Sequence, residues 1–368
     1  GGSFNPMHIG HEKIVDYVLK NLGSDFDIKT FTGNAKISSK NVITGTLNSR
    51  LLNARYTVNP KKQTVVINAR SKGYIKVNYG GSSYVVSPDI ENLVVKFNET
   101  NVLRSGRLRL KLKDLSVPFI KTIRTNIKIH NGNYRVIGTA GTKGGTIVNI
   151  AGTTTSDMKH SYTLSIPKTV DIAQELRANG YNFKGLNKAK LPATVTARIS
   201  GKGSHFSGAY ELFSPYGEYI AEYEKLRVNG KINDLKNLDM TINTNMDELW
   251  FGYQRLKNVK GNLNIKDNVV NISKIQNENL TASGKFDIKT GKMDINAQLK
   301  DYMLYNTSSQ KINLNVGVLT ANLSGTVDKL SGTISLPAAP TTINSNYVGD
   351  TNAFLNIKNG VIDFQNVT

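Results

Sequence analysis

The sequence predicts a mostly β protein: an elongated, curled antiparallel β-sheet, either a groove or a solenoid-like array, with one or two short helices and an N-terminal helical fragment. Three observations lead to this class. From about Ser24 onward, apolar residues recur at every second position, which is the period of half-buried antiparallel strands. Short polar turns rich in Gly, Asn and Asp separate these segments. A helical period is found in only a few places.

The expected elements begin with a helix over residues 12–22, which closes a distinct first segment, 1–22. The remainder, 24–368, is expected to form one repetitive β domain. Its clearest early strand is "RLRLKLKDL". The alternation there puts Leu108, Leu110 and Leu112 on one face and Arg107, Arg109, Lys111 and Lys113 on the other. A hairpin is expected in "KIHNGNYRVI", which begins at Lys128, because Asn-Gly favours a tight two-residue turn.

One helix is predicted in the middle of the chain, in "TVDIAQELRANG". Pro167 lies just ahead of it, Ile172, Ala173 and Leu176 share one face, and Gly180 is a C-terminal cap. The next ambiguous stretch, "SPYGEYIAEYEKL", is interpreted as strand, because its Tyr and Ala residues also alternate.

The C-terminal half predicts a series of hairpins. Turns are expected at Lys266-Asp267-Asn268, at Lys289-Thr290-Gly291 and at Asn359-Gly360. The apolar positions of these hairpins are the following: Leu263, Ile265, Val270, Ile272, Phe286, Ile288, Met293, Ile295, Leu299, Ile312, Leu314, Val316 and Val318. A sheet with such a continuous apolar face must cover it, either by closing on itself or by binding an apolar ligand. The sequence leaves both outcomes open.

The composition is strongly basic. Lys and Arg number 47 against 27 Asp and Glu, for a net charge of +20, which favours anionic partners such as lipid headgroups or nucleic acid. The absence of cysteine excludes disulfides and thiolate metal sites. No apolar run reaches the roughly 20 residues of a membrane-spanning helix. We expect the sequence to be a fragment, with any targeting signal or anchor outside it.

The first segment reads "GGSFNPMHIGH" and resembles the start of the nucleotidyltransferase superfamily, most closely nicotinate-nucleotide adenylyltransferases. In that family the glycine turn and two histidines bind nucleotide phosphates during adenylyl transfer, with Mg²⁺ assisting. The corresponding residues here are Gly1, Gly2, Ser3, His8 and His11. The βα units that should surround the motif do not follow it, so the segment is interpreted as vestigial and the chain as non-enzymatic, without a cofactor. Nucleotidyl transfer from this motif remains an alternative.

The second segment resembles the TamB and AsmA-like family of Gram-negative envelope proteins. The resemblance rests on the cadence of hairpins such as "LTASGKFDIKTGKMDINAQL" and "LTANLSGTVDKLSGTISL". It implies a curled sheet whose apolar residues line a groove for phospholipid acyl chains, conducted between the inner and outer membranes. It also implies a periplasmic location, an inner-membrane anchor outside this chain, a membrane surface and an outer-membrane barrel partner of the BamA/TamA type. A secreted β-solenoid adhesin is the alternative from another class.

Other chemistry is not indicated. His130, His160 and His205 have no partner at a metal-ligand spacing, so no metal is expected. The Gly-rich "GTAGTKGGT" from Gly138 lacks the Gly-Lys-Ser/Thr ending of a phosphate-binding loop and is interpreted as a flexible turn. No nucleic-acid partner is expected, because the positive charge is spread along strands and no aromatic stacking motif accompanies it.

Overall fold

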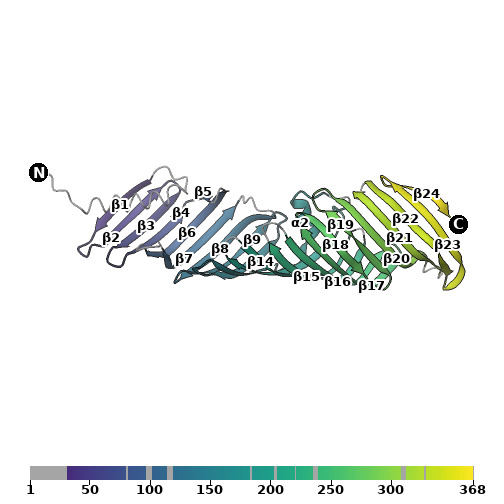
Figure 1. Cartoon of the computed structure of the whole chain (residues 1–368). Helices are drawn as coiled ribbons and strands as arrows, with labels where there is room; N and C mark the ends of the chain where they lie inside the picture. The colour runs from purple at the N-terminus through teal and green to yellow at the C-terminus, as the bar shows by residue number, and fades with distance from the viewer. Residues whose placement is uncertain are drawn as a thin grey trace. The chain divides into compact units, whose positions relative to one another are not determined.

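The expected fold class is confirmed by a computed structural model of the chain. It describes residues 31–79, 82–96, 102–113, 119–182, 185–202, 205–219, 221–234, 239–307, 312–326 and 329–367. These residues form an open antiparallel sheet of 24 strands and one helix, and the sheet does not close into a barrel. Within each unit most strands lie beside their neighbours in the chain (Figure 1), but Ser82–Lys96 pairs with both Thr64–Ser71 and Ile75–Tyr79. The motif and helix expected in residues 1–22 lie outside the described residues.

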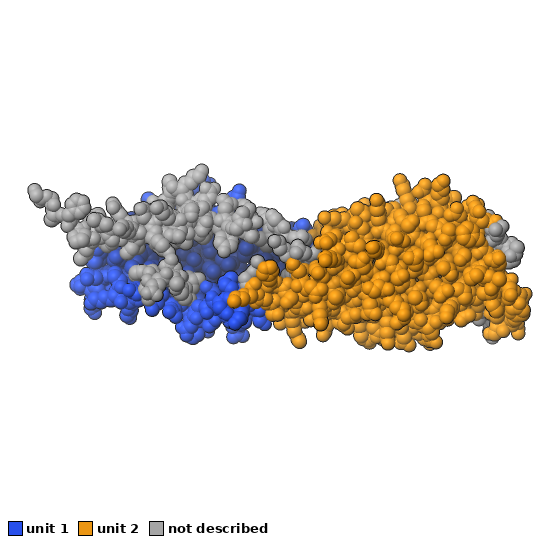
Figure 2. Space-filling view, viewed as in Figure 1, with its two compact units in different colours: residues 1–143, 147–162 blue, residues 144–146, 163–368 orange. Residues whose placement is uncertain are grey.

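The chain divides into two compact units, residues 1–143 with 147–162 and residues 144–146 with 163–368 (Figure 2). The first strands are β1 Phe31–Ile37, β2 Ile43–Ser49, β3 Leu52–Asn59, β4 Thr64–Ser71, β5 Ile75–Tyr79, β6 Ser82–Lys96, β7 Val102–Lys113, β8 Ile120–His130, β9 Asn133–Thr142 and β10 Ile147–Thr154. β11 is Lys159–Ser165, β12 Val170–Asp171 and the helix α2 Ile172–Ala178.

The remaining strands belong to the second unit. They are β13 Pro192–Lys202, β14 His205–Glu218, β15 Glu222–Asp234, β16 Asp239–Phe251, β17 Gln254–Lys266, β18 Val269–Gln276, β19 Leu280–Asp287, β20 Lys292–Thr307, β21 Ile312–Thr326, β22 Lys329–Ile343, β23 Asn346–Lys358 and β24 Val361–Val367. "SPYGEYIAEYEKL" is mostly strand, as expected, but the expected turn is misplaced: Ser-Pro-Tyr-Gly belongs to β14, and Tyr219 and Ala221 lie between β14 and β15.

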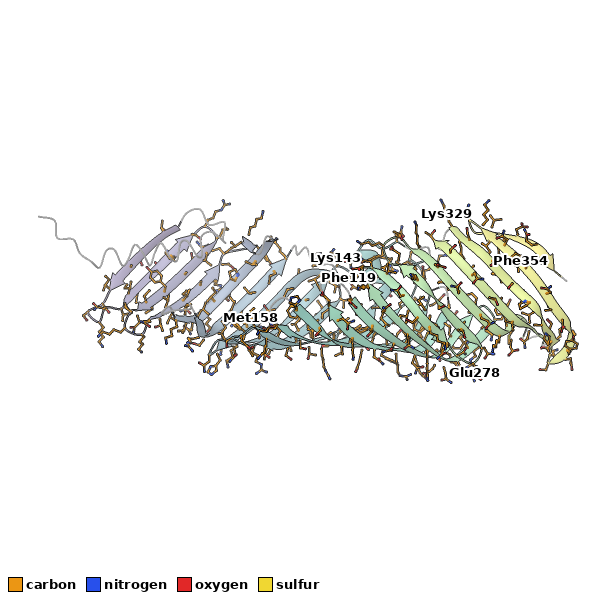
Figure 3. The ribbon with its side chains drawn as sticks, in the orientation of Figure 1. Phe119, Lys143, Met158, Glu278, Lys329 and Phe354 are labelled. Carbon is orange, nitrogen blue, oxygen red and sulfur yellow. The ribbon has the colours of Figure 1, made fainter. Side chains whose placement is uncertain are left out.

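The period of two in the sequence becomes a sheet with an apolar and a polar face. Residues directly opposite each other in an antiparallel pair project from the same side of the sheet. In the first unit, Leu108 is opposite Ile90 on one neighbour and Ile127 on the other. The exposed Arg109 is opposite Asp89 and Asn126. Side chains therefore project from both sides of a single layer (Figure 3).

The expected tight turns form where the sequence places them. Asp267 and Asn268 connect β17 to β18 with φ of 52° and 67°, and Asn359 and Gly360 connect β23 to β24 with φ of 52° and 81°. Two consecutive residues with positive φ give the turn twist that matches paired strands. In the turn before β20, the backbone N–H of Thr290 donates a hydrogen bond to the Asp287 carboxylate. This hydrogen bond is the main cause of the lowered pKa of Asp287. These local signals set the hairpin register.

The predicted helix is confirmed as α2, which is held at the start of the second unit. The Asp171 side chain accepts a hydrogen bond from the Ala173 N–H at 3.0 Å and caps the helix. The buried Glu175 carboxylate accepts from the N–H groups of Gly144 and Thr146, at 3.2 and 3.3 Å. These hydrogen bonds join the helix to the turn at 144–146. They also satisfy the Glu175 carboxylate, which would be costly to bury without hydrogen-bond donors.

The glycine-rich stretch departs from its expectation. Only its last part is a turn, because β9 continues through Gly138 to Thr142. A side chain at Gly138 would place its Cβ 2.2 Å from the Arg124 carbonyl oxygen of the neighbouring strand. The glycine therefore permits a close strand approach instead of providing flexibility.

Tyr210 on β14 makes stability depend on alkaline pH. Its hydroxyl donates to the Thr241 carbonyl at 3.1 Å, and burial raises the pKa of the phenol to about 12. An unfolded tyrosine titrates near about 10. The folded state holds this proton more tightly, so its contribution is complete below pH of about 10 and is lost as pH rises through about 12.

We expect the free energy of unfolding, measured by urea titration, to fall across that range. Tyr210→Phe should flatten the decline, and Tyr216→Phe should leave it unchanged, because Tyr216 is 53% exposed. A decline of the same size in Tyr210→Phe and in the unmodified protein would contradict the assignment.

Candidate functional site: an apolar face on the second unit

Two rows of apolar side chains cross neighbouring strands of the second unit. In the first row, pairing runs from β16 to β20 through Met240, Ile265, Val270, Phe286 and Met293. All members of this row are half-buried. Each residue lies about 5 Å from the next in a direct cross-strand pair, so the row is a continuous apolar stripe perpendicular to the strands.

The second row runs parallel to the first. Its members from β16 to β21 are Ile242, Leu263, Ile272, Gly284, Ile295 and Leu323. The large members are half-buried, and Gly284 leaves an interruption between two isoleucines. The two rows together are called the apolar face below. No helix covers it in the part of the chain that the structure describes, since the side chains of α2 pack on Leu186 and Ala189.

One end of the apolar face is closed by a cluster of buried side chains. Leu256 and Val259 of β17 pack with Leu299 of β20, and these are 3%, 0% and 6% exposed. In a flat sheet, strands three apart would be separated by about 14 Å. Here the backbone N–H of Met303 donates directly to the Gln254 side chain at 2.8 Å. The sheet therefore curls over the short β18–β19 hairpin, and side chains fill its interior at this end.

Seven of the sixteen predicted apolar residues are brought together on this face. Leu263, Ile265, Val270, Ile272, Phe286, Met293 and Ile295 lie in the two rows, and Leu299 lies in the buried cluster. Val316 is buried opposite Tyr302. Ile288 lies in the turn before β20 and bonds to Asn268 through its N–H. Ile312 and Leu314 belong to β21, but their side chains are outside the description.

Other predicted residues are placed elsewhere. Leu108, Leu110 and Leu112 are half-buried on the apolar side of β7, in the first unit. Val318 lies opposite the exposed Lys300, on the polar side. The inner position belongs to Leu319, opposite Leu299. The alternation breaks because Asp301 of β20 has a φ of 49°, which rotates the following residues to the other side.

Several residues of the face were not singled out from the sequence. Met240 and Ile242 follow the same two-residue period in "DMTINTNM" and could have been found from it. Leu256 and Val259 could not, because they are three positions apart, with the positive-φ residue Asn258 between them. Their burial depends on β20, which lies far along the chain.

The opposite side of the same strands is polar. Asn264, Asn271, Lys285 and Asp294 form one cross-strand row there. A second row contains Asn296, Asn322, Thr333 and Asn356. Polar side chains of this kind can remain in contact with solvent, whereas the two apolar rows project from the other side of these strands.

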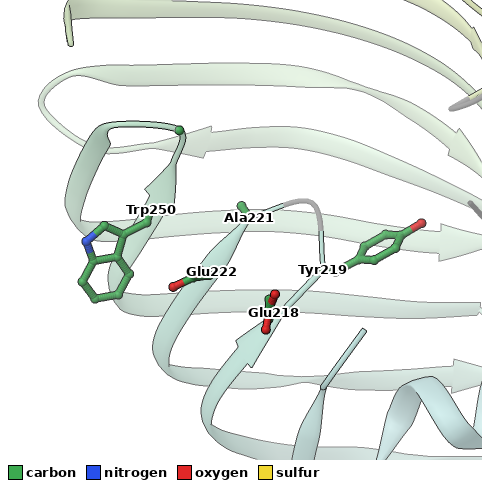
Figure 4. A pocket seen from close by; sticks show the side chains of 6 residues that line it. Glu218, Tyr219, Ala221, Glu222 and Trp250 are labelled. Atoms are coloured by element: carbon green, nitrogen blue, oxygen red, sulfur yellow. The ribbon is translucent and has the colours of Figure 1, made fainter. Parts of the chain in front are cut away.

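A separate pocket of about 370 Å³ lies around Trp250 (Figure 4). Glu218 is directly opposite Glu222, which is opposite Trp250, so the three share the polar side of the sheet. The Arg255 guanidinium lies 5.5 Å from the indole centroid and donates to Glu248, a bond that raises the pKa of Arg255. No metal-binding group of His, Asp and Glu occurs among the described residues. The pocket is thus distinct from the apolar face.

These features define the protein as an open, single-layer antiparallel β-sheet with one apolar and one polar face. Comparison with curated proteins finds one short similarity: 25 residues, 7% of this chain, are 92% identical to a probable nicotinate-nucleotide adenylyltransferase of Fusobacterium nucleatum. The segment spans only 13% of that protein. The resemblance to adenylyltransferases is confirmed for this segment alone, and the activity named belongs to the relative.

No known family and no solved structure matches the chain. The resemblance to the TamB and AsmA-like family therefore stays a prediction. Among the described residues, no helix has both the length and the apolar character needed to cross a bilayer.

Proposed function

We propose that the chain is a non-enzymatic protein that binds the acyl chains of phospholipids along the apolar face of its second unit. The observation that carries this proposal is the pair of apolar rows, one continuous and one interrupted at Gly284, which no second layer covers within the described chain. A contiguous exposed apolar surface on a folded protein is normally a binding surface.

The shape of the face suits an extended, flexible ligand. Each CH₂ group removed from water contributes about 0.8 kcal/mol, so a lipid chain is held by many small, similar contacts. Because the rows repeat strand after strand, a chain that moves along them exchanges one set of contacts for an equivalent set. The buried cluster around Leu256 and Val259 closes one end of this face and leaves the two rows open.

The resemblance to the TamB and AsmA-like family extends the proposal to transport. Lipid would move between inner and outer membrane, in the periplasm, with an outer-membrane barrel protein as the acceptor. The β-solenoid adhesin fits the architecture less well, because every described ladder is antiparallel and the sheet is open. A solenoid stacks its rungs in parallel and fills a closed interior.

The test is native mass spectrometry with lipid extraction on the full chain purified from a Gram-negative host. The variant combines Ile265→Thr, Ile272→Thr and Ile295→Thr, which remove apolar surface while they retain β-branched side chains. A matched control combines Ile37→Thr, Ile343→Thr and Val361→Thr, at positions 44%, 39% and 69% exposed and outside the two rows.

We expect phospholipid to co-purify with the unmodified chain and with the control, and to fall at least about tenfold in the row variant. Circular dichroism and thermal melting establish that all three proteins are folded. A folded chain that carries no lipid would refute the proposal. So would a row variant that retains as much lipid as the control.

A further inference from the structure

The polar side of the first unit carries a dense basic surface. It consists of exposed Arg and Lys side chains on three neighbouring strands: Arg107, Arg109 and Lys111 of β7, Arg124 and Lys128 of β8, and Arg135 of β9. The pairing of β7 with β8 and of β8 with β9 puts all of them on one side of the sheet. This set is called the basic surface below.

The cations of the basic surface face each other directly. Arg107 is opposite Lys128, Lys128 is opposite Arg135, and Lys111 is opposite Arg124. Like charges in direct cross-strand positions destabilise a sheet. The polar side of the second unit is arranged differently.

There, the described lysines that lie in paired strands are not opposite another lysine or arginine. Lys260 is opposite Gln276, Lys274 is opposite Asn262, and Lys285 is opposite Asp294. Within the described ladders, cations directly opposite cations are therefore a local property of β7–β9. It does not follow simply from the net charge of the whole chain.

Among the described residues, counter-charges lie at only one border of the basic surface. Asp89 and Glu91 of β6 lie 3.5 Å and 3.9 Å from Arg109, and Glu91 lies 3.9 Å from Arg107. The other members of the basic surface, Lys111, Arg124, Lys128 and Arg135, form no ion pair with any described residue. An external anion can therefore bind these four cations without breaking an ion pair to a described residue.

Exposed aliphatic side chains accompany these cations. Ile137 of β9 is 51% exposed and is opposite Asn126, so it projects from the same side as Arg135. Ile147 of β10 is 49% exposed and pairs with Gly141 on this same side. Cations combined with exposed apolar side chains are typical of surfaces that bind the interface of a lipid bilayer.

We propose that the basic surface binds the surface of an anionic lipid bilayer. The lysines and arginines attract the acidic headgroups, and Ile137 and Ile147 enter the interface between headgroups and acyl chains. Single-stranded nucleic acid fits less well, because its binding surfaces present aromatic rings for base stacking. The outward positions of β7–β10 have none among the described residues. This inference goes beyond acyl-chain binding and stands independently of it.

The test is co-sedimentation of the full chain with phosphatidylcholine vesicles, with and without phosphatidylglycerol. The variant changes Lys111, Arg124, Lys128 and Arg135 to Gln. A control of equal charge change converts Lys260, Lys266, Lys274 and Lys285, all exposed in the second unit, to Gln. We expect binding to phosphatidylglycerol vesicles to fall at least about tenfold in the variant, and by less than about threefold in the control.

Salt dependence, thermal stability and RNA binding provide further tests of the proposal. Binding by the unmodified chain should weaken as salt is raised, and Ile137→Ser should further reduce the part that persists at high salt. Lys128→Gln should raise the melting temperature, because it removes two like-charge pairs. Equal vesicle binding by variant and control would overturn the proposal. It would also be overturned if the variant lost binding to a single-stranded RNA oligonucleotide while it still bound vesicles.

Discussion

Leu299→Ala is expected to lower the free energy of unfolding by about 2–5 kcal/mol. Leu299 is 6% exposed and packs with Leu256 and Val259, where β17 and β20 approach each other across the β18–β19 hairpin. Truncation removes apolar contacts and leaves a cavity that the two strands cannot fill without sliding along each other. Urea unfolding followed by circular dichroism measures the effect.

The control for this prediction is Val361→Ala, at a position that is 69% exposed on β24. It should change stability by less than about 0.5 kcal/mol, as is usual for exposed sites. A loss below about 1 kcal/mol in Leu299→Ala would mean that the cluster does not hold the curl of the sheet. Leu299→Ala should bind as much lipid as the unmodified chain. The cluster closes one end of the apolar face and does not form its surface.

The second large effect is expected for Gly284→Ala on β19. Gly284 has a φ of 152°, and a Cβ there would lie 2.1 Å from the Asp294 carbonyl oxygen of β20. The substitution combines an unfavourable backbone conformation with a clash against backbone that cannot move alone. We expect a loss of about 1–3 kcal/mol in the free energy of unfolding.

Two other glycines separate the two causes. Gly349 has a φ of 137° with no atom within 4 Å of its Cβ position, and Gly73 has open space without a positive φ. Gly349→Ala therefore reports the backbone strain alone, and Gly73→Ala should be neutral or slightly stabilising. If Gly284→Ala were no more destabilising than Gly349→Ala, the close approach of β19 to β20 would not be the cause.

The two proposals assign different roles to different units of the chain. Acyl-chain binding depends on the inner rows of the second unit, and bilayer binding depends on the outer cations of the first. The row variant should therefore leave vesicle binding intact, and the basic-surface variant should leave co-purified lipid unchanged. Because each variant is also the control for the other, failure of one proposal does not weaken the other.

The fold class, the positions of the hairpins and the side of the sheet on which many residues lie could be predicted from the sequence. These features depend on local chemistry. A period of two needs no knowledge of the partner strand, and Asn359-Gly360 or Asp267-Asn268 adopts a tight turn through its own backbone preferences. The helix in residues 172–178 was equally visible, because its apolar positions and the following Gly180 lie within one short stretch.

The register between strands, and so the contacts between their side chains, became known from the folded structure. Val318 lies opposite Lys300 and Leu319 takes the inner position, since Asp301 on the partner strand interrupts the alternation. Leu256 reaches Leu299 because the sheet curls over two short strands. Lys128 is opposite both Arg107 and Arg135 because β8 pairs with β7 on one side and with β9 on the other. Bulges, curvature and cross-strand pairs are properties of two or more strands together, so no single stretch of sequence specifies them.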